Sequence, residues 1–337
     1  MLPPLESESD LIDQMTTPSP AVRRAVSDVD GDIMILGVGG KMGPTLAELL
    51  VRAGAKRVIG VSRFSDESQQ TYLEKAGVET IKADLLNEED LKSLPQASNI
   101  MLLAGYKFGA SGNQPMTWAM NAWVPGMVMG RFPGSKVIYV SSGNVYAFTE
   151  TDSAGSSEIS ETAPVGEYAG SRLGGERISE YLSVKNRTPL TIVRLFYATE
   201  LRYGIIHDII QKVQRGRTID LTMGHVNQIW QGDANGYLAR MFPMCDYPAK
   251  VVNLTGPEVL TVRRIAEQAG EILGKTPVFS GKESETALLG DTKELYQHFE
   301  SPAISSDQMI DWVAHWVAID GRSIGKPTKY ESRTGSF

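Results

Sequence analysis

Short apolar runs alternate with segments of helical periodicity through the first two thirds of the chain. The run Asp32–Leu36 is almost wholly apolar, and apolar residues then recur at Leu46, Leu49, Leu50 and Ala53. A short continuous apolar run is typical of a buried strand, whereas the later spacing is typical of one face of an amphipathic helix. The pattern therefore predicts a buried strand that leads directly into a helix.

The same alternation continues for about 160 residues. Further apolar strand candidates with helical segments between them lie at 57–61, 78–81, 99–103, 136–141 and 190–195. Strands that alternate with helices in this way form a parallel sheet with helices on both faces. We therefore predict the α/β fold class, as a doubly wound parallel sheet with a smaller C-terminal substrate-binding lobe.

Changes in this alternation of strands and helices suggest four regions of the chain. Residues 1–30 form a polar extension, either an arm that packs on the body or on a second subunit, or a poorly ordered leader. Residues 31–200 form the sheet domain, and residues 201–324 form a smaller lobe interleaved with the last strands of the sheet. Residues 325–337 form a polar tail that is either mobile or an arm. The elements expected in the lobe are helices at 204–215, 233–242, 261–273 and 305–319, and a strand at 250–254.

A glycine-rich turn lies where the first predicted strand meets the first predicted helix. Gly37, Gly40 and Gly43 have GxxGxxG spacing. Such glycines allow a tight turn, close approach of the backbone to a pyrophosphate, and close packing of helix on strand. The helix N-terminus adds free N–H groups and the positive end of its dipole. Because the strand and helix that this motif requires are both predicted, we interpret residues 31–200 as a Rossmann-type NAD(P)-binding domain.

The residues after the second strand indicate which dinucleotide to expect. An acidic residue usually accepts from the ribose 2′-hydroxyl of NAD there, but this chain has Ser62 and Arg63. Arginine can bind a 2′-phosphate with paired donors, and Lys41 would assist it, so NADP is favoured over NAD. An acidic residue after the third strand, here Asp84, can accept from the adenine amino group. The predicted cofactor contacts are Gly37, Gly40, Lys41, Met42, Gly43, Ser62, Arg63, Asp84, Leu85, Ala104 and Gly105.

Two further motifs carry a resemblance to a known family. Residues 136–146 run from a strand into Ser-Ser-x-x-Val-Tyr, and Tyr168-Ala169-Gly170-Ser171-Arg172 opens a later helix. Residues 230–234 (WQGDA) and 254–256 (LTG) follow. Over about residues 31–320, these motifs and the glycine turn resemble the extended short-chain dehydrogenases/reductases, also called the NAD(P)-dependent epimerase/dehydratase family.

The resemblance implies a catalytic set of Ser142, Tyr168 and Arg172. Ser142 would hydrogen-bond the substrate, and Tyr168 would exchange a proton while a hydride moves to or from the nicotinamide C4. A free tyrosine has a pKa near 10, so this role needs a neighbouring cation. The family has lysine where this chain has Arg172, which keeps the charge but not the shape. Tyr168 and Arg172 would also contact the cofactor.

Two functions stay open at this point. One is an NAD(P)-dependent oxidoreductase or epimerase that acts on a carbohydrate-like hydroxyl or carbonyl. The alternative is a dinucleotide-binding sensor or regulator whose active site is impaired by Arg172. Asn121 either bends its helix or orders a water near the tyrosine and cation, or is an ordinary surface residue.

The expected substrate is a free sugar, a sugar acid or a small hydroxy-carbonyl compound. Val226 stands where nucleotide-sugar members of the family have a diphosphate-clamping arginine, and Tyr197 replaces an asparagine of the family. Both departures argue against a standard nucleotide-diphosphate sugar. The predicted substrate contacts are Tyr106, Ser142, Asn144, Tyr197 and Gln228.

The composition of the chain argues against several other classes of protein. The formal net charge of -7 attracts neither nucleic acid nor anionic lipid, and no run of about 18 apolar residues is present to span a membrane. The start MLPPLESESD is acidic where a signal peptide is basic, and a lone Cys245 suits a reducing cytosol, so a cytoplasmic protein is expected. The four histidines are scattered, which predicts no catalytic metal.

A homodimer is expected from the same resemblance. Segments 114–130 and 167–183 match the helices that pair in family dimers. Small residues in the second segment would permit close approach between subunits, or would serve only internal packing. These residues are Ala169, Gly170, Gly174 and Gly175.

Overall fold

A parallel β-sheet forms the core of the protein. In the computed structural model, which describes residues 2–107 and 112–335, seven strands of the described chain pair in the order β12-β7-β5-β4-β1-β2-β3. All of these pairings are parallel. The strands are β1 Ile33–Leu36, β2 Val58–Ser62, β3 Glu79–Lys82, β4 Asn99–Leu102, β5 Lys136–Ser142, β7 Leu190–Leu195 and β12 Lys250–Leu254. The predicted doubly wound parallel sheet is confirmed.

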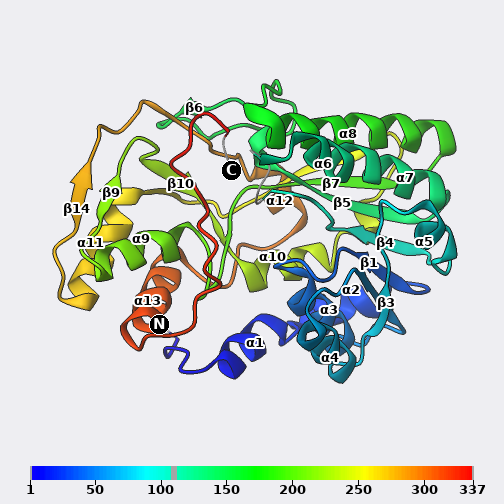
Figure 1. Ribbon diagram of the computed structural model, residues 1–337, viewed down its shortest axis with the longest axis horizontal. Coiled ribbons are helices and arrows are strands. Elements are labelled where there is room, and N and C mark those ends of the chain that lie inside the picture. Colours follow the sequence, from blue (N-terminus) through cyan, green and yellow to red (C-terminus); the bar gives the residue numbers. More distant parts are fainter. Residues whose placement is uncertain (1, 108–111, 336–337) are drawn as a thin grey trace.

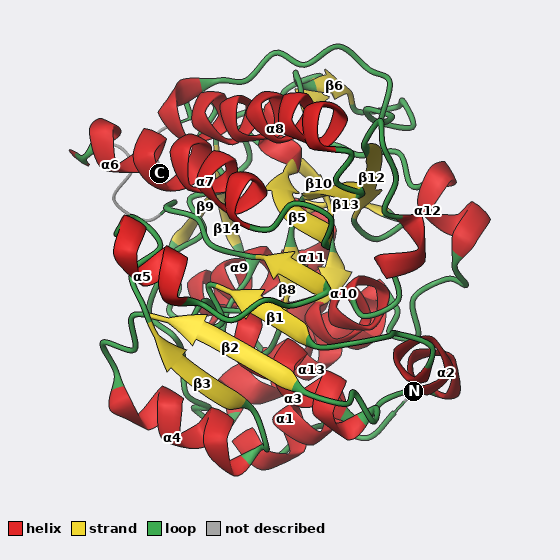
Figure 2. Cartoon of the chain, turned by 90° about the vertical axis from the view of Figure 1, so that its right-hand side faces the viewer, coloured by secondary structure: helices red, strands yellow, loops and turns green. Residues whose placement is uncertain are grey.

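Helices cover both faces of this sheet, as Figure 2 shows. Alternate side chains of a strand point to opposite faces. Ile33 and Ile35 accordingly pack with residues of the helices on one face, and Met34 and Leu36 pack with those on the other. The helices on the first face are α2 Pro20–Ser27, α3 Gly43–Arg52, α4 Glu67–Lys75 and α10 Gln231–Leu238. Those on the second face are α5 Glu88–Ser93 and α7 Val124–Arg131.

The helix α8 Gly166–Asn186 lies beside α7 and beside a helical segment that precedes it, α6 Gln114–Trp118 followed by the π-helical turn η2 Ala119–Trp123. Small residues of α8 face this segment. A side chain at Gly174 would come within 3.1 Å of the Trp118 ring, and one at Gly175 within 2.5 Å of the Tyr139 hydroxyl. These glycines therefore serve packing within the chain.

A smaller lobe stands beside the sheet, to the left in Figure 1. Its apolar core lies between three mutually packed helices: α9 Ile205–Gln214, α11 Val262–Leu273 and α13 Ser306–Ala318. The helix α12 Lys293–His298 packs near β12. Short strands complete the chain: β6 Thr149–Glu150, β8 Ala198–Thr199, β9 Thr218–Asp220, β10 His225–Asn227, β11 Ile229–Trp230, β13 Val259–Thr261, β14 Val278–Ser280 and β15 Thr286–Ala287. The 3₁₀ turns are η3 Gly143–Val145 and η4 Phe242–Met244.

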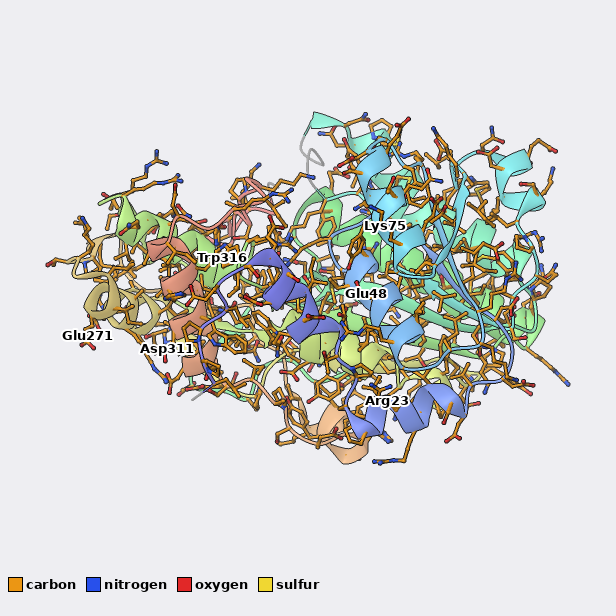
Figure 3. The ribbon with its side chains drawn as sticks, turned by 90° about the horizontal axis from the view of Figure 1, so that it is seen from below. Arg23, Glu48, Lys75, Glu271, Asp311 and Trp316 are labelled. Carbon is orange, nitrogen blue, oxygen red and sulfur yellow. The ribbon has the colours of Figure 1, made fainter. Side chains whose placement is uncertain are left out.

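Both terminal segments pack on the body of the protein. The helix α1 Glu8–Thr16 buries Leu11 and Met15 and lies between α3, marked by Glu48, and α13, marked by Asp311, in Figure 3. The tail after α13 crosses the front of the molecule in Figure 1 and buries Tyr330 in the core of the lobe. Leu11 and Met15 of α1 and Tyr330 of the tail therefore belong to the core of the smaller lobe.

Two features of the described residues bear on other classes of protein. Within residues 2–107 and 112–335, no helix combines the length and apolar character needed to cross a membrane. Across the same residues, no group of three histidine, cysteine or acidic side chains is placed to hold a metal ion.

Candidate active site

The glycine turn forms a cradle at the start of α3. Gly37 has φ of 89°, and a side chain there would lie 2.6 Å from the backbone nitrogen of Ala104. The Gly40 N–H donates to the Gly37 carbonyl at 3.0 Å, which closes the turn. A side chain at Gly43 would strike the backbone of Val38. The turn therefore packs closely on Val38 and Ala104, and the open N–H groups at the start of α3 suit a pyrophosphate.

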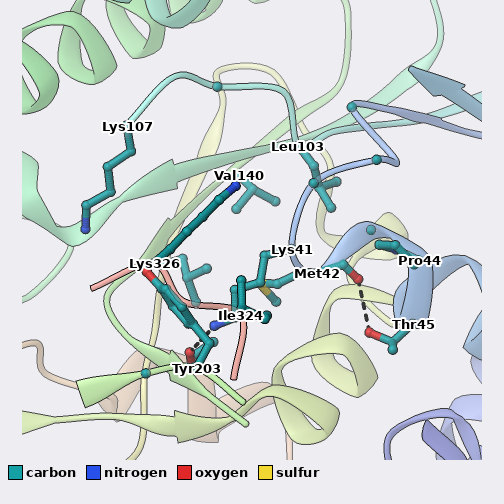
Figure 4. A pocket seen from close by; sticks show the side chains of 18 of the residues that line it. Lys41, Met42, Pro44, Thr45, Leu103, Lys107, Val140, Tyr203, Ile324 and Lys326 are labelled. Atoms are coloured by element: carbon teal, nitrogen blue, oxygen red, sulfur yellow. Dashed lines mark hydrogen bonds between the residues drawn. The ribbon is translucent and has the colours of Figure 1, made fainter. Parts of the chain in front are cut away.

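A pocket of about 710 Å³ lies at the carboxyl ends of the central strands. Figure 4 shows side chains from the glycine turn, from the turn after β4 and from the C-terminal tail converging on it. Many residues predicted from sequence line this pocket: Gly37, Gly40, Lys41, Met42, Gly43, Gly105, Tyr106, Ser142, Asn144, Tyr168, Arg172 and Tyr197. The structure thus brings the predicted cofactor turn and the predicted catalytic residues into one cavity.

Other predicted contacts lie outside the lining of the pocket: Ser62, Arg63, Asp84, Leu85, Ala104 and Gln228. Gln228 is only 2% exposed because its side chain turns inward, where it accepts a hydrogen bond from Thr199. Leu85 packs in the core. The Asp84 carboxylate accepts from the Leu86 N–H at 3.0 Å, and Arg63 is exposed at the end of β2. The Gln228 amide nitrogen is buried without a hydrogen-bond partner among the described residues.

Sequence reasoning missed several residues that line the pocket. Lys107 and Tyr203 are among them, as are Asp66 and Gln69 near the start of α4. The terminal arms carried no signal in the sequence, since only tertiary packing brings them here. They contribute Glu8, Ile12, Arg322, Ile324, Lys326 and Thr328.

Lys41 extends from the glycine turn toward the smaller lobe. Its ammonium donates to the Ala198 carbonyl at 2.7 Å and lies 3.8 Å from the centre of the Tyr203 ring. Burial lowers the pKa of Lys41 to about 7, against the opposing charge of Glu200. In this position Lys41 ties the glycine turn to β8.

The predicted catalytic residues come from two neighbouring elements. Ser142 ends β5, and its hydroxyl donates to the Asn144 side chain at 3.1 Å and accepts from the Asn144 N–H at 3.2 Å. Tyr168 and Arg172 lie one turn apart on α8, so they share a side of the helix. Ser142 and Tyr168 both line the pocket.

Arg172 is directed into the protein. It is 4% exposed, and its guanidinium donates to the carbonyl oxygens of Ala104, at 3.2 Å, and Val140. It also lies 5.1 Å from the centre of the Tyr139 ring. The guanidinium therefore caps the carboxyl ends of β4 and β5, a role that uses its planar, two-armed shape.

Asn121 is buried and links the wall of the pocket to α8 through hydrogen bonds. Its side-chain oxygen accepts from the Tyr106 N–H at 2.7 Å, and its amide donates to the Tyr106 carbonyl and to Ser171, each at 3.0 Å. The Ser171 hydroxyl donates in turn to the Tyr168 carbonyl at 2.9 Å. The backbone around Asn121 widens into the π-helical turn η2, so Asn121 lies where its helix departs from regular α-helical geometry. Its side chain is buried, so it is not a surface residue.

This arrangement defines a class of protein: a Rossmann-type protein in which the glycine turn, Ser142 and Tyr168 line one pocket. The model of the NAD dependent epimerase/dehydratase family matches residues 33–228. The chain therefore belongs to this family, and the protein is an enzyme. No curated protein matches the sequence at a significant level.

Solved structures of sugar-nucleotide epimerases share the fold. UDP-glucuronic acid 4-epimerase from Bacillus cereus, in complex with NAD, has a TM-score of 0.72 at 18% identity and covers 85% of this chain and 96% of its own. UDP-glucose 4-epimerase from Thermus thermophilus, also with NAD, has a TM-score of 0.71 at 15% identity and covers 84% and 98%. A UDP-galactose 4-epimerase has a TM-score of 0.69 at 19% identity and covers 86% and 99%.

Proposed function

We propose that this enzyme transfers a hydride between the nicotinamide C4 of NAD(P) and a carbon of a sugar-like substrate that bears a hydroxyl or carbonyl group. The observation that carries the proposal is the meeting of Ser142 and Tyr168 with the glycine cradle in one pocket. The reaction is an oxidation or reduction, or an epimerisation in which the substrate is oxidised and the hydride returned.

The residues of the chain would act as follows in alcohol oxidation. The Ser142 hydroxyl holds the substrate oxygen, and the phenolate of Tyr168 removes the hydroxyl proton as the carbon loses its hydride. In the reverse direction, the Tyr168 hydroxyl returns the proton to the carbonyl oxygen. The dinucleotide, when bound, supplies only the hydride acceptor or donor. The turn from Gly37 to Gly43 would hold its pyrophosphate, because Gly40 has no side chain and only the Gly37 carbonyl lies within 4 Å of a Cβ built there.

We propose NADP as the preferred cofactor. Arg63 follows β2 and is exposed, so its guanidinium is available to a 2′-phosphate. Two observations favour NAD instead: Asp66 lines the pocket near the start of α4, and two of the structural neighbours named above contain NAD. Fluorescence titration of the purified protein with NADPH and NADH separates the two. Tighter NADPH binding that is lost in Arg63→Ala supports NADP, and equal or tighter NADH binding refutes it.

The proposed substrate is a free sugar, a sugar acid or a small hydroxy-carbonyl compound. Val226 is 1% exposed and lies in β10, where it pairs with the strand β13. This position therefore offers no charge to a diphosphate. Structural neighbours act on UDP-sugars, which makes UDP-glucose and UDP-glucuronic acid the necessary comparison compounds. The proposal is tested with a panel of free aldoses, uronic acids and these two nucleotide sugars. Each is assayed by NAD(P)H absorbance and by product chromatography.

The alternative function is a dinucleotide sensor, and the buried bonds of Arg172 to main-chain carbonyls favour it. The variant Tyr168→Phe discriminates between the two. The enzyme proposal expects a loss of turnover by about 100-fold or more, with cofactor binding retained. A sensor binds NAD(P) equally well in both forms and turns over none of the panel.

We also propose a homodimer and a cytoplasmic location. The helices α6 to α8 expose an apolar face made of Trp118, Trp123, Ile178, Tyr181 and Val184, with exposures between 37% and 64%. An exposed apolar patch of this kind marks an interface. The cytoplasmic location rests on the chain having a single cysteine, Cys245.

Sedimentation velocity tests the dimer. The double variant Trp123→Glu/Tyr181→Glu is expected to sediment as a monomer, because two carboxylates cannot be buried unpaired in an interface. Ile272→Glu, at an exposed apolar position of α11, is the matched control and leaves a dimer intact. A wild-type protein that is monomeric at micromolar concentration refutes the proposal.

A further inference from the structure

The position that holds a lysine in the family holds a buried arginine here, and a different lysine lies over the tyrosine. The Lys107 ammonium is 5.5 Å from the centre of the Tyr168 ring and 6.0 Å from that of Tyr197. Figure 4 shows Lys107 on the turn after β4, among the residues that line the pocket. Arg172, in contrast, directs its donors to the strand ends.

We propose that the two roles of the family's single lysine are divided in this chain: Lys107 supplies the cation that stabilises the Tyr168 phenolate, and Arg172 is a positioning residue that fixes the strand ends. This inference rests on the proposed role of Tyr168 as acid/base. Lys107 acts through Tyr168, so it too is a positioning residue.

The position of Arg172 limits what it can do for the tyrosine. A side chain at Gly105 would lie 2.6 Å from its Nη1 atom, so the turn after β4 is packed tightly against the guanidinium. Its Nε atom has no hydrogen-bond partner among the described residues. The group is held by main-chain carbonyls that a moving guanidinium would leave unpaired, at a cost of about 1–3 kcal/mol for each buried group.

The position of Lys107 is set by the neighbouring backbone. The side chain of Asn121 both accepts from and donates to the main chain of Tyr106, and it also donates to Ser171 on the turn of α8 that carries Tyr168. One buried amide therefore ties the turn that presents Lys107 to the helix that presents the tyrosine. These bonds fix the backbone from which the Lys107 side chain extends.

Burial lowers the pKa of Lys107 to about 8, so its ammonium is present at neutral pH, and a phenolate formed beside it would oppose the loss of its proton. Other charged or titratable groups surround the pair and enter any measured pH profile. They are Lys41 from the glycine turn, Tyr139 from β5, Arg172 from α8, Tyr197 after β7, Tyr203 before α9 and Glu331 from the tail. Burial raises the pKa of Tyr139 to about 12 and those of Tyr197 and Tyr203 further, which leaves the range below about pH 11 clear of these three rings.

The test measures phenolate absorbance at 295 nm against pH and needs no substrate. Each of wild type, Lys107→Met and Lys107→Arg is compared with the same protein carrying Tyr168→Phe, so the difference isolates Tyr168. Removal of a charge whose nitrogen lies 5.5 Å from the ring centre is expected to shift the titration upward by about one pH unit, because Lys107 itself loses part of its charge over the same range. Lys107→Arg stays charged throughout and is expected to give a midpoint at or below that of wild type.

Two further variants separate a charge effect from a structural one. Lys282→Met, an exposed lysine of the smaller lobe, leaves the titration unchanged. Arg172→Met is expected to lower the thermal midpoint of unfolding but to shift the Tyr168 titration less than Lys107→Met does. A midpoint that is the same in Lys107→Met and wild type overturns the inference, as does a larger shift in Arg172→Met.

The result is distinguishable from failure of the proposed function. If Tyr168→Phe keeps full turnover, the acid/base proposal fails whatever the titration shows. If Tyr168→Phe abolishes turnover while Lys107→Met leaves the titration in place, the proposed function stands and only the assignment of Lys107 fails.

Discussion

Removal of Arg194 is the sharpest test of how α8 is held on the sheet. Its guanidinium on β7 lies 2.8 Å from the carboxylate of Glu176 on α8, and the two side chains are 3% and 0% exposed. Ser141 donates to the same carboxylate at 2.5 Å. Arg194 also donates at 2.6 Å to the hydroxyl of Tyr146, which donates to Asn253 at 2.9 Å. The pair therefore anchors the helix that carries Tyr168.

The expected cost follows from this burial. Arg194→Met leaves the Glu176 carboxylate in the interior, where Ser141 still donates to it but its guanidinium partner is gone, and an uncompensated buried charge costs about 3–5 kcal/mol of unfolding free energy. Replacing both partners, as Glu176→Leu/Arg194→Met, removes the buried charge with its partner. The double variant is therefore expected to lose about 2 kcal/mol less than Arg194→Met alone.

Urea unfolding followed by tryptophan fluorescence supplies the free energies for a double-mutant cycle. Glu176→Leu, Arg194→Met, the double variant and wild type are measured at about pH 7 with fixed cofactor content, since a bound ligand would raise apparent stability. A loss below about 1 kcal/mol for Arg194→Met, or a double variant as unstable as the sum of the single ones, would refute the reasoning.

Three further outcomes are expected. Gly37→Ala abolishes NADPH binding in the fluorescence titration, because its φ of 89° and a contact of 2.6 Å with Ala104 exclude a side chain, whereas Gly130→Ala, with open space around it, binds normally. Burial lowers the pKa of His207, which favours its neutral form in the folded protein. The free energy of unfolding is therefore highest above about pH 6.5 and falls by up to about 1.4 kcal/mol per pH unit below it. His207→Gln is expected to reduce this slope in urea unfolding. Tyr330→Ala costs about 3 kcal/mol in the same assay because the ring is 2% exposed, whereas Tyr330→Phe is nearly neutral, since the hydroxyl has no partner among the described residues; equal losses in the two would contradict this.

The central sheet was predictable because its strands carry their own pattern. The apolar runs predicted at 99–103 and 190–195 became β4 Asn99–Leu102 and β7 Leu190–Leu195. A strand buried on both faces has no polar alternation, so a short apolar run bounded by helical segments is nearly sufficient to identify it. The glycine turn was predictable for the same reason, since its spacing and its flanking elements are local.

The site was predictable only in part. Ser142 and Tyr168 were predicted from motifs, and both line the pocket, whereas Gln228 was predicted from its position along the chain, and its side chain turns inward to Thr199. Lys107 carried no motif of its own. Its proximity to Tyr168 depends on the bend at Asn121 and on the packing of α8, which are contacts between distant segments.

What the sequence determines by itself is therefore the order of strands and helices, the cofactor turn and the family. These follow from residue spacing over a few turns of chain, where periodicity and backbone sterics act locally. Only the tertiary structure decides that Arg172 faces main-chain carbonyls, that Lys107 lies over the Tyr168 ring, and that two terminal arms line the pocket. The direction of a side chain depends on which partners the whole fold brings within reach, and those partners lie far away in the sequence.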